Sequence, residues 1–250
     1  MAISVEHVSA EHVSTEHGDS VVHGAGLLIA FEGGDGAGKS SQAVLLAQAL
    51  ALREIGVRLT GEPGGTALGV RLRRLLLESG EPLSARAEAL LFAADRAEHV
   101  AGVIGPALDR GEVVITDRFV DSSLAYQGAG RGLAVEDLKR ISRWVSGDLV
   151  PDLTVLLDIE PERGLARIRG PGAGPDRLEA ETLAFHRRVR AGFRALAEAE
   201  SNRYLVLDAD RPADYLAAEI SATVMRRLEG RAARDISSPT AGQADGTPAP

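Results

Sequence analysis

The chain contains no cysteine, few aromatic residues and no long apolar run. Without cysteine it forms neither disulfides nor thiolate metal sites, which fits a cytoplasmic protein. No apolar stretch approaches the ~18 residues that a membrane helix needs, and the first residues lack the basic-then-apolar order of a secretory signal. We therefore expect a cytoplasmic location and no membrane partner.

Positive charge is also scarce, because the formal net charge is −8 over 250 residues. This balance argues against a nucleic-acid partner and favours a small anion held in a local basic pocket. Lysine is nearly absent, since only Lys39 and Lys139 occur among 28 basic residues. A lysine inside a motif is therefore more informative here than in a lysine-rich chain.

Residues 33–40, GGDGAGKS, complete the phosphate-loop pattern G-x-x-x-x-G-K-[ST]. A run of strand length precedes the loop and a helical pattern follows it, which places phosphates at a helix N-terminus. Lys39 would reach the β/γ-phosphates and the Ser40 hydroxyl would ligate Mg²⁺. The motif thus predicts a site for a nucleoside triphosphate. Its residues are Gly33, Gly34, Asp35, Gly36, Ala37, Gly38, Lys39, Ser40 and Ser41.

Apolar strands and helices alternate between two tails. Strands are expected at 26–32, 57–61, 111–117, 153–159 and 203–208, and helices at 38–55, 66–79, 84–109, 134–146, 161–169, 177–200 and 212–229. The pattern predicts an α/β fold of the P-loop NTPase type: three layers, with a five-stranded parallel sheet flanked by helices and a short lid. Pro106 is expected to kink the helix over 84–109 or end it early.

One domain is expected over residues 26–230. Residues 1–25 repeat Glu-His-Val-Ser with a period of five, which matches neither a helix nor a strand. Residues 231–250 are rich in Pro, Gly, Ala and Ser. Both segments are predicted to be disordered tails.

Several polar residues are expected at the carboxyl ends of the strands, where ligands gather in parallel sheets. Glu62 and Asp117 follow two strands and should face one crevice. Asp117 suits an acid that holds Mg²⁺, although a strand-terminal Asp also serves as a turn cap. Arg118 beside it favours anion binding. Phe92 and Arg96 lie one helical turn apart, so they could sandwich a base, with a core role for Phe92 as the alternative.

Three arginines flank the Gly/Pro-rich segment 170–175: Arg167, Arg169 and Arg177. Phosphoryl transfer requires cations near the developing charge and the exclusion of water. The segment therefore favours a closing lid, with a solvated loop between helices as the alternative.

Together the motifs resemble those of the thymidylate (dTMP) kinase family, bacterial type with a lid arginine. The matching pieces occur in the family's order: FEGGDGAGKSSQ (31–42), EPGGT (62–66), LRRLLL (72–77), LLFAADR (90–96), DRF (117–119), SSLAYQGAGRG (122–132) and PDLTVLLD (151–158). The resemblance implies transfer of the ATP γ-phosphate to dTMP with Mg²⁺, giving dTDP for dTTP biosynthesis. It also implies a homodimer, for which the helices over 66–79 and 84–109 could supply an apolar face.

The resemblance assigns a role to each matching residue. On the donor side, Lys39, Ser40 and the loop backbone would hold ATP and Mg²⁺. Asp117 would serve the metal or orient the acceptor phosphate. On the acceptor side, Asp35 would accept from the 3′-OH of dTMP, Phe92 would stack on thymine, Arg96 would donate to its O4, Arg73 and Arg118 would clamp the phosphate, and Ser123, Tyr126 and Gln127 would line the pocket.

The expected catalytic groups are Lys39, Asp117, Arg118 and Arg169. Gly36 stands where some family members carry a loop arginine, so the catalytic cation would come from the lid, with Arg169 preferred over Arg167 and Arg177. Two other functions remain open from the residues. A kinase for AMP or UMP is disfavoured by Phe92 with Arg96, and a non-catalytic nucleotide-binding protein is disfavoured by Arg73, Arg118, Arg169 and Asp117 together.

Overall fold

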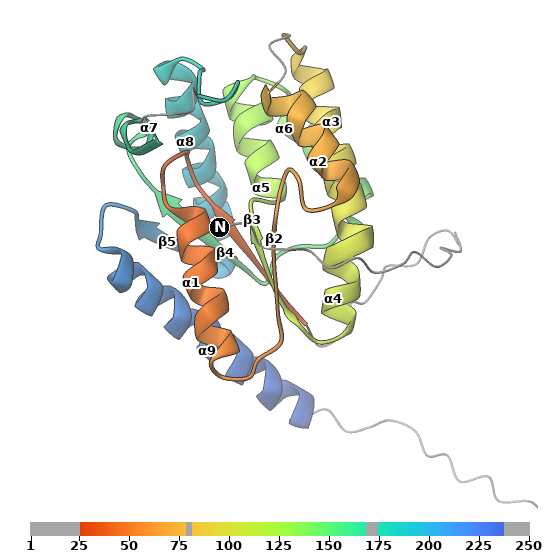
Figure 1. The fold of residues 1–250 in the computed structure, drawn as a ribbon, viewed down its shortest axis with the longest axis vertical. Coiled ribbons are helices and arrows are strands. Elements are labelled where there is room, and N and C mark those ends of the chain that lie inside the picture. Colours follow the sequence, from red (N-terminus) through yellow and green to blue (C-terminus); the bar gives the residue numbers. More distant parts are fainter. Residues whose placement is uncertain (1–25, 79–81, 169–174, 238–250) are drawn as a thin grey trace, which may run out of the picture.

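The computed structural model describes residues 26–78, 82–168 and 175–237. Its middle layer is a five-stranded parallel sheet in the order β2-β3-β1-β4-β5 (Figure 1). The strands are β1 (Leu27–Glu32), β2 (Val57–Gly61), β3 (Val113–Asp117), β4 (Leu153–Asp158) and β5 (Tyr204–Asp208). Each strand lies within two residues of its predicted bounds, and the predicted fold class is confirmed.

Helices cover both faces of the sheet (Figure 1). On one face, α1 (Lys39–Ala51) and α9 (Ala213–Ser237) pack against alternate residues of β1, including Ile29. On the other face, α4 (Gly105–Asp109) packs against Leu28 and Ala30 of the same strand. α8 (Leu183–Ala199) covers β4 on this second face. The near-continuous apolar strands of the sequence are thus explained by burial on both sides.

The remaining helices surround the carboxyl ends of the strands. They are α2 (Ala67–Arg73), α3 (Ala85–His99), α5 (Val120–Ser123), α6 (Val135–Ser146) and α7 (Pro161–Ile168). The helix predicted over 84–109 is divided: a π-helical turn at Val100–Ile104 separates α3 from α4. Pro106 lies in the first turn of α4, where its missing N–H is tolerated. A second π-helical turn, Arg74–Glu78, continues α2.

The sequence pattern predicts no helix over residues 120–130, yet α5 continues there in a π-helical turn, Leu124–Gly130. Glycines weaken helices, and this stretch ends in two of them. Tertiary contacts override that preference. The Glu32 carboxylate accepts from the Phe119 N–H at 2.9 Å and the Ser122 N–H at 3.1 Å. Gly130 packs so closely on Phe185 that a Cβ would come within 2.6 Å of the ring.

Helix α9 continues to Ser237, so the predicted start of the C-terminal tail at residue 231 is wrong. Alanine and arginine, which make up residues 231–234, are among the strongest helix formers. The predicted tail at 1–25 and the remainder of the C-terminal tail lie outside the described residues. Within the described part of the chain, no helix has the length and apolarity to cross a membrane.

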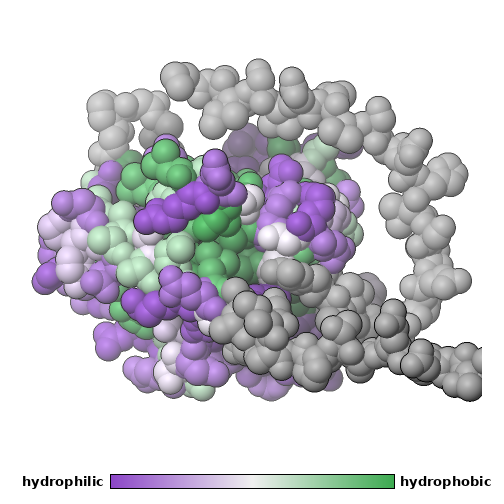
Figure 2. All heavy atoms as spheres, turned by 90° about the horizontal axis from the view of Figure 1, so that it is seen from below, coloured by the Kyte–Doolittle hydropathy of each residue, from purple (hydrophilic) through white to green (hydrophobic). Residues whose placement is uncertain are grey.

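The two ends of the sheet differ in character. The carboxyl ends of the strands point toward the loops that carry the motifs, at the top of Figure 1. Figure 2 shows the molecule from below, with hydrophobic residues toward the centre of the view and hydrophilic residues around them. Lys39, Ser40 and Asp117 from the motifs line one cavity at the carboxyl ends of the strands.

We expect Leu50→Ala to lower the free energy of unfolding by about 2–5 kcal/mol, because the Leu50 side chain is fully buried between α1 and the sheet. Leu52→Ala is the matched control, since Leu52 is 86% exposed two residues further on. Urea unfolding followed by circular dichroism measures both changes. If Leu52→Ala lowered the free energy of unfolding as much as Leu50→Ala does, the burial of Leu50 between α1 and the sheet would be contradicted.

Candidate active site

The loop between β1 and α1 has the backbone of a phosphate cradle. Gly33 and Gly36 adopt φ angles of +134° and +73°. Neither position has room for a side chain: a Cβ would come 2.3 Å from the Leu157 carbonyl oxygen at Gly33 and 2.0 Å from that of Gly164 at Gly36. Gly164 belongs to α7, so α7 rests directly on the loop. The N-terminus of α1 faces the same space and supplies free N–H groups.

Lys39 is buried at the base of this loop, and its Nζ donates to the Gly34 carbonyl oxygen at 2.8 Å. Burial, and then the positive charge of Arg118, lower the pKa of Lys39 from 10.5 to about 8, against the opposing effect of three nearby carboxylates. The ammonium group is therefore charged at neutral pH and loses its proton more easily than an exposed lysine does.

Asp117, at the end of β3, faces Ser40 in the first turn of α1. Ser40 Oγ donates to Asp117 Oδ2 at 2.5 Å. The other carboxylate oxygen, Oδ1, is buried and has no hydrogen-bond partner within the described residues. A hydroxyl and a carboxylate oxygen are ligands that suit Mg²⁺, which usually completes its shell with phosphates and water. The pair fits a magnesium ion, and no described cluster of three or more His, Cys, Asp or Glu offers another metal centre.

Arg118 links the end of β3 to the phosphate loop. Its Nη2 donates to Asp35 Oδ1 at 2.6 Å, and the Tyr126 hydroxyl donates to Asp35 Oδ2 at 2.9 Å. Burial raises the pKa of Asp35, but the charges of Arg118 and Lys39 outweigh it and hold this pKa below its ordinary value. Arg118 has a φ of +73°, a conformation that is costly for a residue with a side chain. The side chain of Asp35 is thus ionised and fixed on both oxygens.

Glu32, which was not among the predicted site residues, lies fully buried at the end of β1. Besides the two N–H groups at the start of α5, its carboxylate accepts from Ser122 Oγ at 2.5 Å. Burial, and then the charge of Asp121, raise the pKa of Glu32 to about 7. The sequence could have indicated Glu32, because this carboxylate ends an apolar strand in the same way as Asp117 does.

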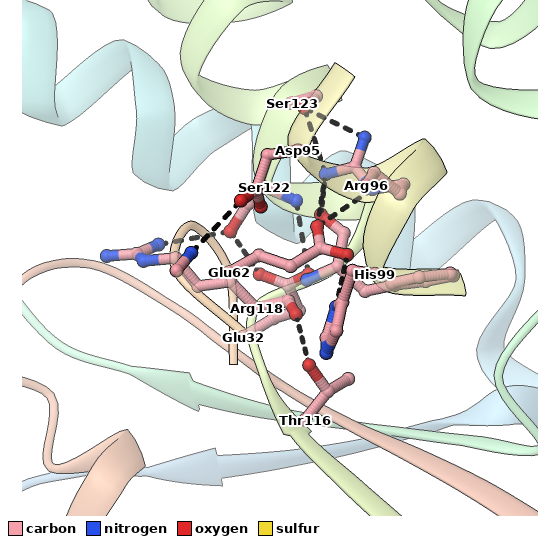
Figure 3. Close-up of polar contacts among 11 residues, drawn as sticks. Glu32, Glu62, Asp95, Arg96, His99, Thr116, Arg118, Ser122 and Ser123 are labelled. Carbon is pink, nitrogen blue, oxygen red and sulfur yellow. Dashed lines mark hydrogen bonds and ion pairs between the residues drawn. The ribbon is translucent and has the colours of Figure 1, made fainter. Parts of the chain in front are cut away.

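A second cluster of charges joins α3 to the end of β2, and two of its members, Glu62 and Arg96, line the cavity (Figure 3). Arg96 is 2% exposed, and its Nε donates to Glu62 Oε2 at 2.9 Å. The other oxygen of Glu62 lies 3.0 Å from His99 Nδ1. Since Glu62 and Asp117 line the same cavity, the predicted common crevice is confirmed. No sequence motif indicated His99, whose partners lie 37 and 39 residues away.

The two groups of residues meet in one cavity of about 340 Å³ at the carboxyl ends of the strands. All residues predicted to bind the acceptor line it: Asp35, Arg73, Phe92, Arg96, Arg118, Ser123, Tyr126 and Gln127. Gly36, Lys39, Ser40 and Asp117 line it from the phosphate-loop side. The other loop residues, Gly33, Gly34, Ala37, Gly38 and Ser41, lie outside this lining.

The structure does not bring two of the three predicted lid arginines to the cavity. Arg167 Nη2 donates to Asp210 Oδ1 at 2.8 Å and its Nη1 donates to the Ala209 carbonyl oxygen at 3.0 Å. Arg177 forms an ion pair with the buried Glu88 at 2.7 Å. Arg169, the preferred catalytic arginine, lies outside the described residues.

A parallel α/β sheet with a phosphate loop facing an arginine-rich cavity defines a P-loop phosphotransferase of small nucleotides. The family model described as "Thymidylate kinase" matches residues 31–220, and the chain belongs to this family. The phosphorylation of dTMP to dTDP is the reaction of this family, and the chain is a nucleoside-monophosphate kinase by this membership.

The relatives cover most of the chain. It is 52% identical to the thymidylate kinase of Leifsonia xyli subsp. xyli over 82% of this chain and 96% of that protein. It is also 52% identical to the thymidylate kinase of Deinococcus radiodurans, over 81% and 98%. A crystal structure of thymidylate kinase from Ehrlichia chaffeensis aligns with a TM-score of 0.67 and 32% identity, over 81% of this chain and 99% of that one.

We expect a polyphosphate such as inorganic tripolyphosphate to bind more weakly as the pH rises through about 8. A lowered pKa of about 8 means that Lys39 is charged below this pH and neutral above it, and the charged form attracts the anion. Above pH 8 the dissociation constant should rise by up to about tenfold per pH unit. Isothermal titration calorimetry across this range measures the change.

Lys39→Arg is the control, because arginine stays charged throughout. Its binding is expected to be weaker but to depend on pH only through the titration of the ligand, which both proteins share. If the dissociation constants of the two proteins changed with pH in the same way, Lys39 would not be the group whose loss of charge weakens binding.

Proposed function

We propose that this chain transfers the γ-phosphate of ATP to dTMP with the help of Mg²⁺. The observation that carries the proposal is the single cavity in which the phosphate loop faces the wall formed by Phe92, Arg96 and Ser123. The phosphate loop suits the phosphates of one nucleotide, and the wall with its aromatic ring and arginine suits the base of a second. Because both lie in one cavity, the phosphates of the two nucleotides can meet there. The fold positions both reactants, which is where most of the catalytic effect in phosphoryl transfer arises.

At the donor end, the loop over 33–41 would hold the phosphates of ATP through its N–H groups, with Lys39 at the β/γ-phosphates. Ser40 and Asp117 would hold the metal, a role that the buried, partnerless Oδ1 of Asp117 supports. Mg²⁺ bound there supplies positive charge to the phosphates being separated.

At the acceptor end, each role follows from the type and place of the side chain. Arg73 and Arg118 would clamp the dTMP phosphate, and the ionised Asp35 would accept from the 3′-OH. Phe92 would stack on thymine while Arg96 donates to O4, an oxygen that cytosine replaces with an amino donor. Ser123, Tyr126 and Gln127 would complete the pocket around the base and sugar.

In the transfer, an oxygen of the dTMP phosphate attacks the γ-phosphorus, the bond to the β,γ-bridging oxygen breaks, and ADP leaves. Lys39, Arg118 and Asp117 would neutralise or orient the reacting phosphates. The further cation would be Arg169 of the lid, since Gly36 leaves the loop without one. The contacts of Arg167 and Arg177 suit a supporting role at the two ends of the lid segment.

We further propose a cytoplasmic homodimer built from one kinase domain per chain, with no nucleic-acid partner. Exposed apolar side chains on α2 and α3 support the dimer: Leu68 is 39%, Val70 is 43% and Leu90 is 56% exposed. Covering such side chains against a second copy would remove apolar surface from water. Sedimentation of a monomer at micromolar concentration would refute this part of the proposal.

An ADP-release assay with ATP and Mg²⁺ is expected to show a strong preference for dTMP among dTMP, dUMP, dCMP, UMP and AMP. For dCMP, kcat/KM should be at least about a hundredfold lower than for dTMP, because the Arg96 N–H would face another donor. Comparable turnover with UMP or AMP would refute the thymine pocket. ATP binding without turnover of any of these acceptors would favour a non-catalytic protein.

Arg169→Ala is expected to lower kcat by about a thousandfold with little change in the KM values, the effect typical of an arginine that acts at the transition state. Arg187→Ala is the matched control, because Arg187 is exposed on α8 and pairs with Glu162. Steady-state kinetics of both variants test this. Intact transfer in Arg169→Ala, with transfer abolished in Lys39→Ala, would show that the lid supplies no catalytic cation.

A further inference from the structure

Helix α3 holds the end of β2 and the loop that follows it, residues 60–65, through three buried side chains (Figure 3). The side chains are Asp95, Arg96 and His99, and each is at most 2% exposed. Their partners in this segment are Thr60, Glu62 and the Gly64 N–H. Because Arg73 Nη1 also donates to the Pro63 carbonyl oxygen at 3.1 Å, the segment connects Arg73 with Arg96, two of the residues proposed to contact the acceptor.

His99 binds a different partner with each ring nitrogen. Nε2 lies 2.6 Å from Thr60 Oγ1, and Nδ1 lies 3.0 Å from Glu62 Oε1. An ionised carboxylate only accepts hydrogen bonds, so Nδ1 carries the proton that is donated to Glu62. A Cβ on Gly65 would come 2.6 Å from the ring, so the backbone at Gly65 packs directly against the imidazole. The close approach explains why glycine suits this position of the EPGGT motif.

Glu62 passes this restraint on to Arg96. Its second oxygen, Oε2, accepts from Nε at 2.9 Å and lies 2.8 Å from Nη2. Nη2 also donates to the Phe119 carbonyl oxygen at 2.9 Å, and Nη1 donates to Ser123 Oγ at 3.2 Å. Nη1 carries two hydrogens, so one N–H remains beyond these described contacts for a group in the cavity that Arg96 lines.

We propose that His99 is a positioning residue for pyrimidine recognition: by fixing the Glu62 carboxylate, it fixes the direction in which Arg96 presents its remaining N–H. This inference rests on the proposed contact of Arg96 with the 4-oxo group of the base. A carboxylate held at one oxygen turns about its last bond, and the Nδ1 contact at the other oxygen prevents that rotation. Direction matters because a hydrogen bond weakens steeply as its angle departs from linear.

Two substitutions of His99 distinguish the proposed positioning of Glu62 from a role in which the ring only fills space in the core. The amide of asparagine overlays the Nδ1 side of the imidazole, so His99→Asn keeps a donor for Glu62 and loses the contact with Thr60. The amide of glutamine reaches the Nε2 position, so His99→Gln keeps the Thr60 contact and loses the donor for Glu62. Both remove the ring from the same buried place, and each is therefore the control for the other.

We expect His99→Gln to raise the KM for dTMP about tenfold, with kcat and the KM for ATP nearly unchanged, while His99→Asn stays within about threefold of the parent protein. The ratio of kcat/KM for dTMP over dCMP should fall in His99→Gln alone. Steady-state kinetics on the full chain measure these constants, and thermal unfolding shows that both variants are folded.

Equal KM values for dTMP in the two variants, or equal increases in the KM values for dTMP and ATP, would overturn the positioning role. If His99→Gln does not fold, His99→Leu fills the same buried place without a donor for Glu62, and an unchanged KM for dTMP in that variant would overturn the inference. Failure of the proposed function is distinguishable, because it would already appear as a missing dTMP preference in the parent protein.

Discussion

The ion pair between Arg118 and Asp35 joins the two halves of the site. Arg118 follows β3, and Asp35 belongs to the phosphate loop after the central strand β1. The strained backbone of Arg118 is held by the contacts of its guanidinium with Asp35, Gly33 and Ser122. Tyr126 donates to the same carboxylate and so ties the π-helical turn over 124–130 to the loop. The donor and acceptor ends therefore share one rigid connection.

Buried carboxylates repeat this arrangement at the ends of β1 and β2, the two strands on either side of β3. Glu32 at the end of β1 holds the start of α5, and Glu62 after β2 holds α3 through Arg96 and His99. Each carboxylate is compensated by N–H or guanidinium donors, as a buried charge requires. A chain with an overall negative charge thereby fixes its cations around a cavity for anions. Asp35 orients Arg118 and Glu62 orients Arg96 in this way.

Local sequence patterns predicted most of the fold, because strands buried on both faces read as short apolar runs and the phosphate loop has a fixed spacing. They failed where distant contacts decide the structure. The helical stretch over 120–130 depends on Glu32, which lies 87 residues before Phe119. The contacts of His99 and the ion pair of Arg177 with Glu88 were not predicted, because nothing near these residues in the sequence indicates their partners. The residues lining the cavity were identified through the family's motifs, and Phe92 alone would have read equally well as a core residue.

The close approach of Gly36 to Gly164 limits which residues the phosphate loop of this chain can carry. A methyl group at Gly36 would lie 2.0 Å from the Gly164 carbonyl oxygen, so the phosphate loop and α7 occupy complementary halves of one space. An arginine at position 36 would displace α7, the helix that carries Arg167. A side chain at position 36 therefore requires the phosphate loop and α7 to change together.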